Sequence, residues 1–342
     1  MRSSDCSAKP QKRLTAFEHR ILRTLRNCGA VHRRILIAVS GGVDSMALLS
    51  VLVRLQPLLK NELAVIHAHH GLGPNVPQKQ KTFRNRARQL VSTAADAYGV
   101  KCFTVVYRGR VALASEAQFR AFRWRAIFRT QKTWRAQIIA TAHNADDLLE
   151  TRLLRLLRGT GLRGLAAMFV KSSTQERRVI IRPFLQVSRQ EILSYAKEMQ
   201  LSWLEDPSNE NLEYRRNWLR HVWLPLLRKA WPSADQTLAR SLETIVTEWS
   251  QVGSRRRKLS RDIVQNKVMS RPKYLALSRE EKSACLADYL VAVGIHDFTQ
   301  GQIYEISRYL DSSRKRFKFK AVRREWMVTP SEIRVKLQTR GF

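Results

Sequence analysis

The chain has 342 residues, with 62 Lys and Arg against 28 Asp and Glu, a formal net charge of +34, and 44% hydrophobic residues. Its length supports two or three folded domains, and its composition excludes a disulfide-stapled miniature and wholesale disorder. So large a positive charge repels itself in a compact fold, and we therefore expect a polyanionic partner, foremost nucleic acid; proteome-wide basicity in the source organism is the alternative.

The first half of the chain alternates short aliphatic runs with longer segments of helical period, which indicates a parallel sheet wrapped by helices. Strands are predicted at residues 35–39, 63–70, 101–107, 137–143 and 179–184. Helices are predicted between them at residues 45–55, 78–98, 115–131 and 145–158. A further helix is expected to begin at Ser188, with Glu191 completing a capping box. The fold class expected is α/β with a doubly wound parallel sheet.

The pattern changes after the turn-rich residues 205–209, where helices dominate and short strand-like runs follow. Helices are predicted at 214–228, 234–252, 278–293 and 299–310, and strands at 317–322, 326–328 and 333–337. We therefore expect a basic N-terminal segment or helix at 1–34, a catalytic domain at 35–210, a helical linker at 211–234 and a mainly helical, basic C-terminal domain at 235–342. Basic clusters at 255–258 and 314–316 suit a phosphate backbone, although a solvated loop explains each equally well.

The four cysteines, Cys6, Cys28, Cys102 and Cys285, form no C-x-x-C pair of the kind that indicates zinc, an iron–sulfur cluster or a redox dithiol. No apolar run is long enough to span a bilayer, and the N-terminus has no secretory apolar region. We expect a cytoplasmic protein without membrane attachment. The sequence does not indicate its oligomeric state.

The sharpest motif directly follows the first predicted strand and opens the first helix: Ser40, Gly41, Gly42, Val43, Asp44 and Ser45. Glycines let the backbone approach an anion, the helix N-terminus points N–H groups at it, and the serine hydroxyls add donors. This pattern predicts a phosphate cradle that is neither a Walker A loop nor a dinucleotide turn. An acid there would repel phosphate, so Asp44 is predicted to hold Mg²⁺. A plain glycine turn with a capping serine is the alternative.

Two carboxylates, Asp147 and Glu150, are three residues apart on one predicted helix, shortly after His143 at the carboxyl end of a strand. Residues at this spacing share a helix face, and such strand ends are where α/β sheets bind ligands. The pair suits an ammonium group or Mg²⁺; the alternative is first-turn acids that answer the helix dipole. Arg120 and Arg123 are predicted to neutralise phosphate or the leaving pyrophosphate, or else to form an exposed basic face. His143 is a supporting candidate only.

The loop at residues 40–45 resembles the PP-loop of ATP pyrophosphatases, which cleave ATP to AMP and PPi. Its companions are, in order, residues 67–72 (HAHHGL), 116–117 with Arg120, Arg123 and Trp124, 141–151 (TAHNADDLLET), 156–165 (LLRGTGLRGL), 182–185 (RPFL), 205–209 (EDPSN) and 216–217. From about residue 35 to 230, this ordered set resembles the tRNA(Ile)-lysidine synthetases. Asn144, Leu148 and Gly73 depart from the family pattern, which leaves nucleotide and lysine contacts open.

The resemblance implies ATP with Mg²⁺ at residues 40–45, L-lysine near Asp147 and Glu150, and support of the nucleotide by Arg123 and His143. It implies catalytic roles for Asp44, Asp147, Glu150 and Arg120. It implies that lysine is ligated to C2 of the wobble cytidine of a tRNA(Ile) with a CAU anticodon, through an adenylated cytosine, with release of AMP and PPi. Two alternatives remain. One is a PP-loop tRNA thiolase, which would usually need paired cysteines, and the other is a non-catalytic RNA-binding protein on a PP-loop scaffold.

Overall fold

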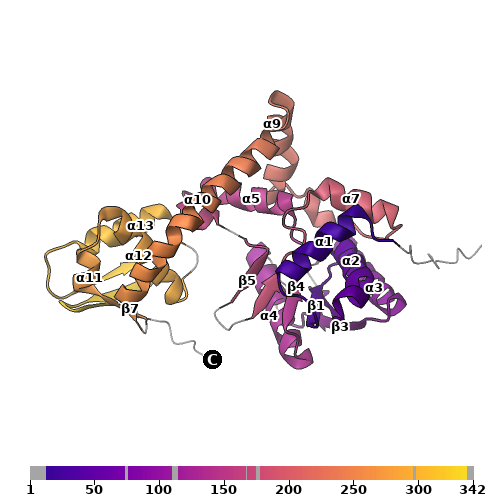
Figure 1. The fold of residues 1–342 in the computed structure, drawn as a ribbon, viewed down its shortest axis with the longest axis horizontal. Coiled ribbons are helices and arrows are strands. Elements are labelled where there is room, and N and C mark those ends of the chain that lie inside the picture. The colour runs from indigo at the N-terminus through magenta and orange to yellow at the C-terminus, as the bar shows by residue number, and fades with distance from the viewer. Residues whose placement is uncertain are drawn as a thin grey trace, which may run out of the picture. The chain divides into compact units, whose positions relative to one another are not determined.

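The computed structural model describes residues 13–73, 76–109, 115–166, 168–174, 178–265, 267–295 and 298–336, with the backbone alone at residues 163 and 249–261. The chain divides into two compact units (Figure 1). The first comprises Met1–Leu148 with Met168–Trp223, and the second Leu149–Ala167 with Leu224–Phe342. In the described part of the chain, no helix combines the length and apolar character needed to cross a membrane.

The first unit is built on a six-stranded sheet of order β3-β2-β1-β4-β6-β5. Its strands are β1 (Arg34–Ala38), β2 (Glu62–His69), β3 (Lys101–Val106), β4 (Ile138–Ala140), β5 (Lys171–Ser173) and β6 (Val179–Ile181). Every pairing is parallel except that of β5, which runs antiparallel to β6 at the edge. The near-continuous aliphatic runs of β1 and β2 suit such a sheet, because its central strands are buried on both faces.

Helices cover both faces of this sheet. The helices of the unit are α1 (Ala16–Asn27), α2 (Val43–Leu59), α3 (Gln78–Ala97), α4 (Glu116–Trp134), the start of α5 (Ala145–Leu156), α7 (Arg189–Glu198), the 3₁₀ turn η1 (Pro207–Glu210), α8 (Arg215–Trp218) and the π-helical turn η2 (Leu219–Trp223). One core joins the sheet to α1, α2, α3 and α7. A smaller core on the opposite face joins it to α4. This is the doubly wound arrangement that the sequence predicts.

The strand order reverses at β1, which lies between β2 and β4. The connection after β1 leads toward one edge of the sheet, and the chain later returns to place β4 on the other side of β1. Open α/β sheets bind ligands outside the carboxyl ends of the strands at such a switch point. The loops that follow β1 and β4 are residues 39–42 and 141–144, and they open α2 and α5, the helices that carry Asp44, Asp147 and Glu150.

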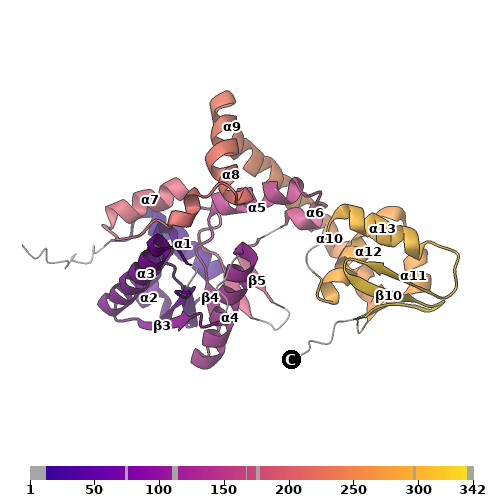
Figure 2. The same cartoon turned by 180° about the vertical axis from the view of Figure 1, so that it is seen from behind.

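The second unit has a core of its own, formed by a five-stranded antiparallel sheet and the helices beside it (Figure 2). The sheet has the order β7-β8-β11-β10-β9, with β7 (Val264–Gln265), β8 (Val268–Ser270), β9 (Phe317–Ala321), β10 (Arg324–Val328) and β11 (Glu332–Val335). The helices are α6 (Leu162–Leu165), α9 (Leu224–Ala230), α10 (Ala234–Ile263), α11 (Arg271–Leu275), α12 (Arg279–Ala292) and α13 (Gln300–Leu310). Trp326 on β10 is completely buried in this core.

The observed division differs from the predicted domain bounds in three ways. Helix α1 does not stand apart from residues 35–210, because Ile21 and Leu25 pack into the core of the first unit. Residues Leu149–Ala167, expected in the catalytic domain, group with the second unit. The boundary near the predicted linker falls at Trp223, inside a run of helical turns. The basic side chains at 255–258, and residues 1–12, lie outside the described parts.

Candidate functional site

The loop after β1 is held in the shape of an anion cradle. Gly42 caps α2 from an extended conformation, and Gly41 adopts a φ of +94° with Ala87 of α3 3.3 Å from where a Cβ would stand. The hydroxyl of Ser45 donates to the carbonyl of Gly42 at 2.9 Å and accepts from the N–H of Ser40 at 3.1 Å. These bonds close the loop around the first turn of a 17-residue helix, where N–H groups without intrahelical partners favour an anion.

Asp44 lies in that first helical turn with little access to solvent. Its Oδ1 is buried and has no hydrogen-bond partner among the described residues, while its Oδ2 lies 3.5 Å from Nη1 of Arg189. The pKa of Asp44 is raised, mainly by desolvation and further by the carboxylate of Asp147, although Arg189 opposes the shift. A half-buried carboxylate whose Oδ1 has no partner among the described residues, beside a phosphate cradle, is well suited to receive a cation.

The loop after β4 leads into α5 through a reciprocal cap. The buried side chain of Asn144 accepts from the N–H of Asp147 at 2.9 Å, and Oδ2 of Asp147 accepts from the N–H of Asn144 at 3.1 Å. Asn144 departs from the family pattern, yet the structure gives it a clear role because it begins α5 and fixes Asp147. Thr141 holds the ring of His143 through a 2.9 Å hydrogen bond to Nδ1.

Asp147 is also held by two guanidinium groups. Its Oδ1 lies 2.9 Å from Nη2 of Arg216 and 3.2 Å from Nη2 of Arg220. These arginines flank the start of η2. A π turn changes the direction in which side chains point, compared with a continuous α-helix. Asp147 therefore caps α5 and also takes part in an ion-pair network. The alternative interpretation of Asp147, an acid that serves the first turn of its helix, holds in part.

The neighbouring acids on α5 differ from Asp147. Oδ2 of Asp146 accepts from the N–H of Arg189 at 2.8 Å and so satisfies the N-terminus of α7. Glu150 is 1% exposed. It lies one helical turn after Asp147, as its spacing predicts. Burying a carboxyl side chain costs free energy unless it is hydrogen-bonded or paired, so position 150 is a demanding place for an acid.

A cluster of cations surrounds the entrance to α5 within the first unit. Desolvation lowers the pKa of Arg120, Arg123 and Arg182, and a neighbouring guanidinium lowers each further: Arg216 for Arg120, and Arg120 for the other two. His143 lies in the same field. Its pKa falls to about 4, first through desolvation and also through Arg182, Arg120 and Arg216, with Asp147 opposing the fall. Cations that depress one another's pKa values form a site that favours a polyanion.

A second group of side chains follows β2. The ring of His70 packs edge-on against Phe119 at 4.9 Å, and Nη1 of Arg84 donates to the carbonyl of Gly71 at 2.8 Å. Desolvation lowers the pKa of His70 to about 3, and Arg123 and Arg84 add to the effect. His70 is thus a neutral ring at physiological pH. The electrostatic effect of Arg123 on His70 connects this group to the cation cluster.

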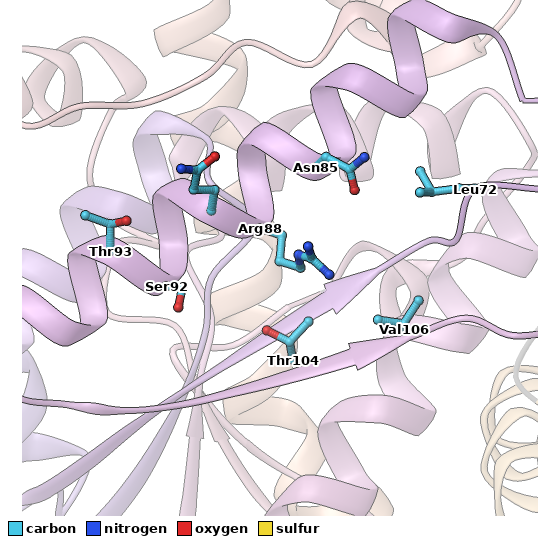
Figure 3. A pocket seen from close by; sticks show the side chains of 8 residues that line it. Leu72, Asn85, Arg88, Ser92, Thr93, Thr104 and Val106 are labelled. Carbon is cyan, nitrogen blue, oxygen red and sulfur yellow. The ribbon is translucent and has the colours of Figure 1, made fainter.

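One pocket of the first unit lies away from the predicted site residues. It has a volume of about 910 Å³ and lies between α3 and β3 (Figure 3). Arg88 extends from α3 toward Thr104 on β3 in this pocket (Figure 3). The lining residues are Leu72, Asn85, Arg88, Gln89, Ser92, Thr93, Thr104 and Val106. Because none of these is a predicted site residue, the pocket does not define the phosphate site.

The residues present fit a magnesium ion that is shared with a phosphate ligand. The described residues contain no group of three or more His, Cys, Asp or Glu side chains that could cage a metal. Mg²⁺ is commonly held by one or two carboxylates together with substrate phosphates and water. The unpartnered Oδ1 of Asp44 beside the cradle provides one such carboxylate oxygen.

The structure brings most predicted site residues into one neighbourhood. Residues 40–45, His143, Asp147, Arg120 and Arg123 all belong to the first unit and are linked by the bonds and electrostatic effects described above. Sequence reasoning missed Arg189 and Arg220. The only local indication that Arg189 belongs to the site is its position beside the Ser188 helix cap. Arg220 has no local indication, because its partner Asp147 lies 73 residues away in the chain.

Comparisons with known proteins agree with this geometry. Residues 13–227 match the model of the PP-loop domain family. A tRNA(Ile)-lysidine synthase of Bdellovibrio bacteriovorus is 34% identical over 324 residues, 93% of this chain and 96% of that protein. A tRNA(Ile)-lysidine synthase of Vibrio cholerae is 38% identical over 211 residues, but these cover only 46% of its length. Among solved structures, the U34-tRNA thiolase NcsA of Methanococcus maripaludis, at 16% identity, aligns over 68% of this chain and 78% of its own with a TM-score of 0.54, a likeness of fold.

Proposed function

Because the chain belongs to the PP-loop family and, within it, to the tRNA(Ile)-lysidine synthases, we propose that it is a ligase that uses ATP to attach L-lysine to tRNA(Ile). The product is lysidine at the wobble cytidine of a CAU anticodon, formed with release of AMP and PPi. The chain spans nearly the whole of the Bdellovibrio relative but less than half of the Vibrio one. Its substrates and partners are therefore part of the proposal.

One observation carries the proposal on the structural side. The cradle after β1 and the capped acid after β4 flank the switch point of the sheet, and the carboxylate of Asp147 is close enough to Asp44 to raise its pKa. A nucleotide phosphate chain bound at the cradle would therefore meet the cation cluster around Arg120. Phosphoryl chemistry depends mainly on such positioning and on charge stabilisation.

The first step activates the base. Oxygen O2 of the cytosine attacks the α-phosphorus of ATP, the bond to the pyrophosphate oxygen breaks, and an adenylated cytosine forms. Main-chain N–H groups at the start of α2 hold phosphate oxygens, and Arg120 and Arg123 stabilise the charge that develops on the departing pyrophosphate. Mg²⁺ held by Asp44 would neutralise phosphate charge when it is bound.

The second step forms the carbon–nitrogen bond. The side-chain amine of lysine attacks C2, and the C2–O2 bond breaks so that AMP leaves with that oxygen. A free lysine ammonium titrates near ~10.4, so it must lose a proton before it attacks. We assign this task and ammonium binding to Glu150 and Asp147. Arg216 and Arg220 hold the carboxylate of Asp147 in place at the start of α5.

The remaining assignments follow from charge. His143, with its pKa held near 4, is neutral at physiological pH and can support the nucleotide by hydrogen bonding but not as a cation. We assign tRNA binding to the basic C-terminal part, residues 235–342, and ATP chemistry to the unit that contains residues 40–45. An unstacked anticodon base must reach the catalytic loops, and single-stranded loops are where proteins read RNA bases most directly.

The decisive experiment mixes the full chain with ATP, Mg²⁺, radiolabelled lysine and a tRNA bearing a CAU anticodon. We expect label on the RNA, with AMP and PPi released in equal amounts, and no transfer when the wobble cytosine is replaced. AMP release without label would point to another nucleophile, such as the sulfur of a thiolase reaction. RNA binding with neither product would leave only the non-catalytic RNA-binding function.

A variant of Asp44 tests the predicted magnesium ligand. We expect Asp44→Asn to reduce turnover by at least a hundredfold while the Kd for tRNA stays within about twofold, because the change removes one charge from the ATP site and none from the RNA surface. Asp146→Asn is the matched control, since Asp146 serves α7. Unchanged turnover in Asp44→Asn would contradict the magnesium assignment.

A further inference from the structure

Arg189, the first residue of α7, lies beside the phosphate cradle without belonging to its loop. Its Nη1 is 3.5 Å from Oδ2 of Asp44, which makes an ion pair. Among the described residues, its hydrogen bonds come from its main chain and not from its guanidinium. A guanidinium carries five N–H donors in a fixed fork. Those of Arg189 are therefore available to a ligand.

Arginines with a structural role in the first unit direct their donors at protein oxygens. Arg54 donates from Nε and Nη2 to the carboxylate of Glu18. Arg182 donates from Nη1 to the carbonyl of Phe169 at 2.9 Å. The side chain of Arg189 differs, because it is 36% exposed and meets one carboxylate at ion-pair distance only. An arginine whose donors the protein does not use can bind an anionic ligand.

The main chain that carries Arg189 is fixed to the loop after β4. The N–H of Arg189 donates to Oδ2 of Asp146 at 2.8 Å, and the N–H of Ala145 donates to the carbonyl of Val187 at 2.9 Å. The hydroxyl of Ser188 caps α7 at the same point. These bonds tie the first turn of α7 to the first turn of α5, so the guanidinium extends from a fixed base.

Helix α7 is also joined to α2, the helix that the cradle opens. Ile192 and Tyr195 of α7 belong to the same buried core as Met46 and Leu49 of α2. The hydroxyl of Tyr195 lies 3.5 Å from that of Ser50. The cradle and the base of Arg189 are therefore parts of one packed body, and only the side chain of Arg189 has freedom to adjust to a ligand.

The two oxygens of Asp44 face different surroundings. Oδ1 has no hydrogen-bond partner among the described residues, whereas Oδ2 faces Arg189. One carboxylate can thus offer Oδ1 to a metal ion and keep Arg189 at Oδ2. Because Arg189 offsets the charge of Asp44, the acid repels an arriving phosphate less. The planar fork of the guanidinium matches two phosphate oxygens at once.

We propose that Arg189 binds the β- and γ-phosphates of ATP at the cradle and holds them as pyrophosphate after the bond to the α-phosphorus breaks. The proposal rests on the proposed function, since it adds a residue to the ATP half of that reaction. The α-phosphorus must face the cytosine, on the side of Asp147 and Glu150. The two outer phosphates then lie toward Asp44 and Arg189. Arg189 binds them in the ground state, whereas Arg120 and Arg123 act on the charge that develops.

Equilibrium titration tests this assignment with three probes, namely pyrophosphate, ATP and AMP, each with Mg²⁺ and without RNA or lysine. We expect Arg189→Gln to raise the Kd for pyrophosphate and for ATP roughly tenfold or more, because charge-assisted hydrogen bonds are lost. The Kd for AMP should stay within about twofold, since AMP lacks the outer phosphates. Arg189→Lys should recover part of the affinity, because it keeps the charge without the fork. In lysine transfer, the KM for ATP should rise more than kcat falls.

Arg20→Gln is the matched control. It removes the same charge from a side chain of similar exposure, 37%, that pairs with Glu191 on the same helix. We expect it to keep all three Kd values within about twofold. Arg189→Gln retains the N–H that bonds to Asp146, so both variants should fold, and thermal melting checks this.

Unchanged pyrophosphate binding in Arg189→Gln would overturn the proposal, as would an unaltered chain that does not bind pyrophosphate. Equal weakening by Arg20→Gln would overturn it too, because net charge alone would then explain the effect. So would an equal loss of AMP binding, which would mean that Arg189 supports the whole nucleotide site. These titrations need neither tRNA nor lysine, so the assignment of Arg189 and the proposed lysine transfer fail separately.

Discussion

At the scale of single residues, Asp147 shows how a catalytic candidate can also be structural. We expect Asp147→Ala to lower the free energy of unfolding by about 1–3 kcal/mol, because it removes a helix cap and leaves the guanidiniums of Arg216 and Arg220 without their shared carboxylate. Urea denaturation measures the change. Glu62→Ala, which breaks one exposed pair with Arg34, should cost less than about 1 kcal/mol; equal costs would contradict the network.

The same residue marks the limit of sequence reasoning. The spacing of Asp147 and Glu150 correctly predicts their shared helix, because a local pattern determines it. The ion pairs of Asp147 join residues 69 and 73 positions apart and depend on a π turn. No local pattern predicts that turn. The residue types at a site can therefore be predicted from the sequence, whereas the partners that each side chain binds can be known only from the fold.

At the scale of elements, the predictions succeed where burial is continuous and weaken where strands are short. Strands β1, β2 and β3 begin and end within one residue of the predicted bounds, since long aliphatic runs define them. Strands β5, β7 and β8 have two or three residues each and are absent from the predicted set. Their pairing partners, not their own sequences, make them strands. The capping box at Ser188 and Glu191 is confirmed because it is entirely local.

The loop between β1 and α2 makes an element-level prediction. Gly41→Ala should lower the free energy of unfolding by more than about 1 kcal/mol and weaken ATP binding, because φ is +94° and the added Cβ would stand only 3.3 Å from the Cβ of Ala87. Gly99→Ala is the control, with a φ of +63° but no atom within 4 Å of the added Cβ. Equilibrium ATP binding separates the two: only Gly41→Ala should weaken it, and equal affinity in both would contradict the cradle.

At the scale of the whole molecule, the two units have separate cores, and ATP is assigned to the first of them. A ligand that binds only folded protein stabilises it by about 2.7 kcal/mol at a hundred times its Kd. We therefore expect calorimetry to resolve two unfolding transitions, of which ATP with Mg²⁺ raises only one. The transition that shifts identifies the unit that holds ATP.

A core variant assigns those transitions. Trp326→Ala removes a fully buried side chain from the second unit and should lower the stability of that unit by roughly 3–5 kcal/mol. The transition that does not respond to ATP should fall or vanish, while the one that responds to ATP should keep both its midpoint and its ATP shift. If a single transition responded both to ATP and to Trp326→Ala, the units would unfold as one cooperative body, and the assignment of ATP to a separately stable unit would be wrong.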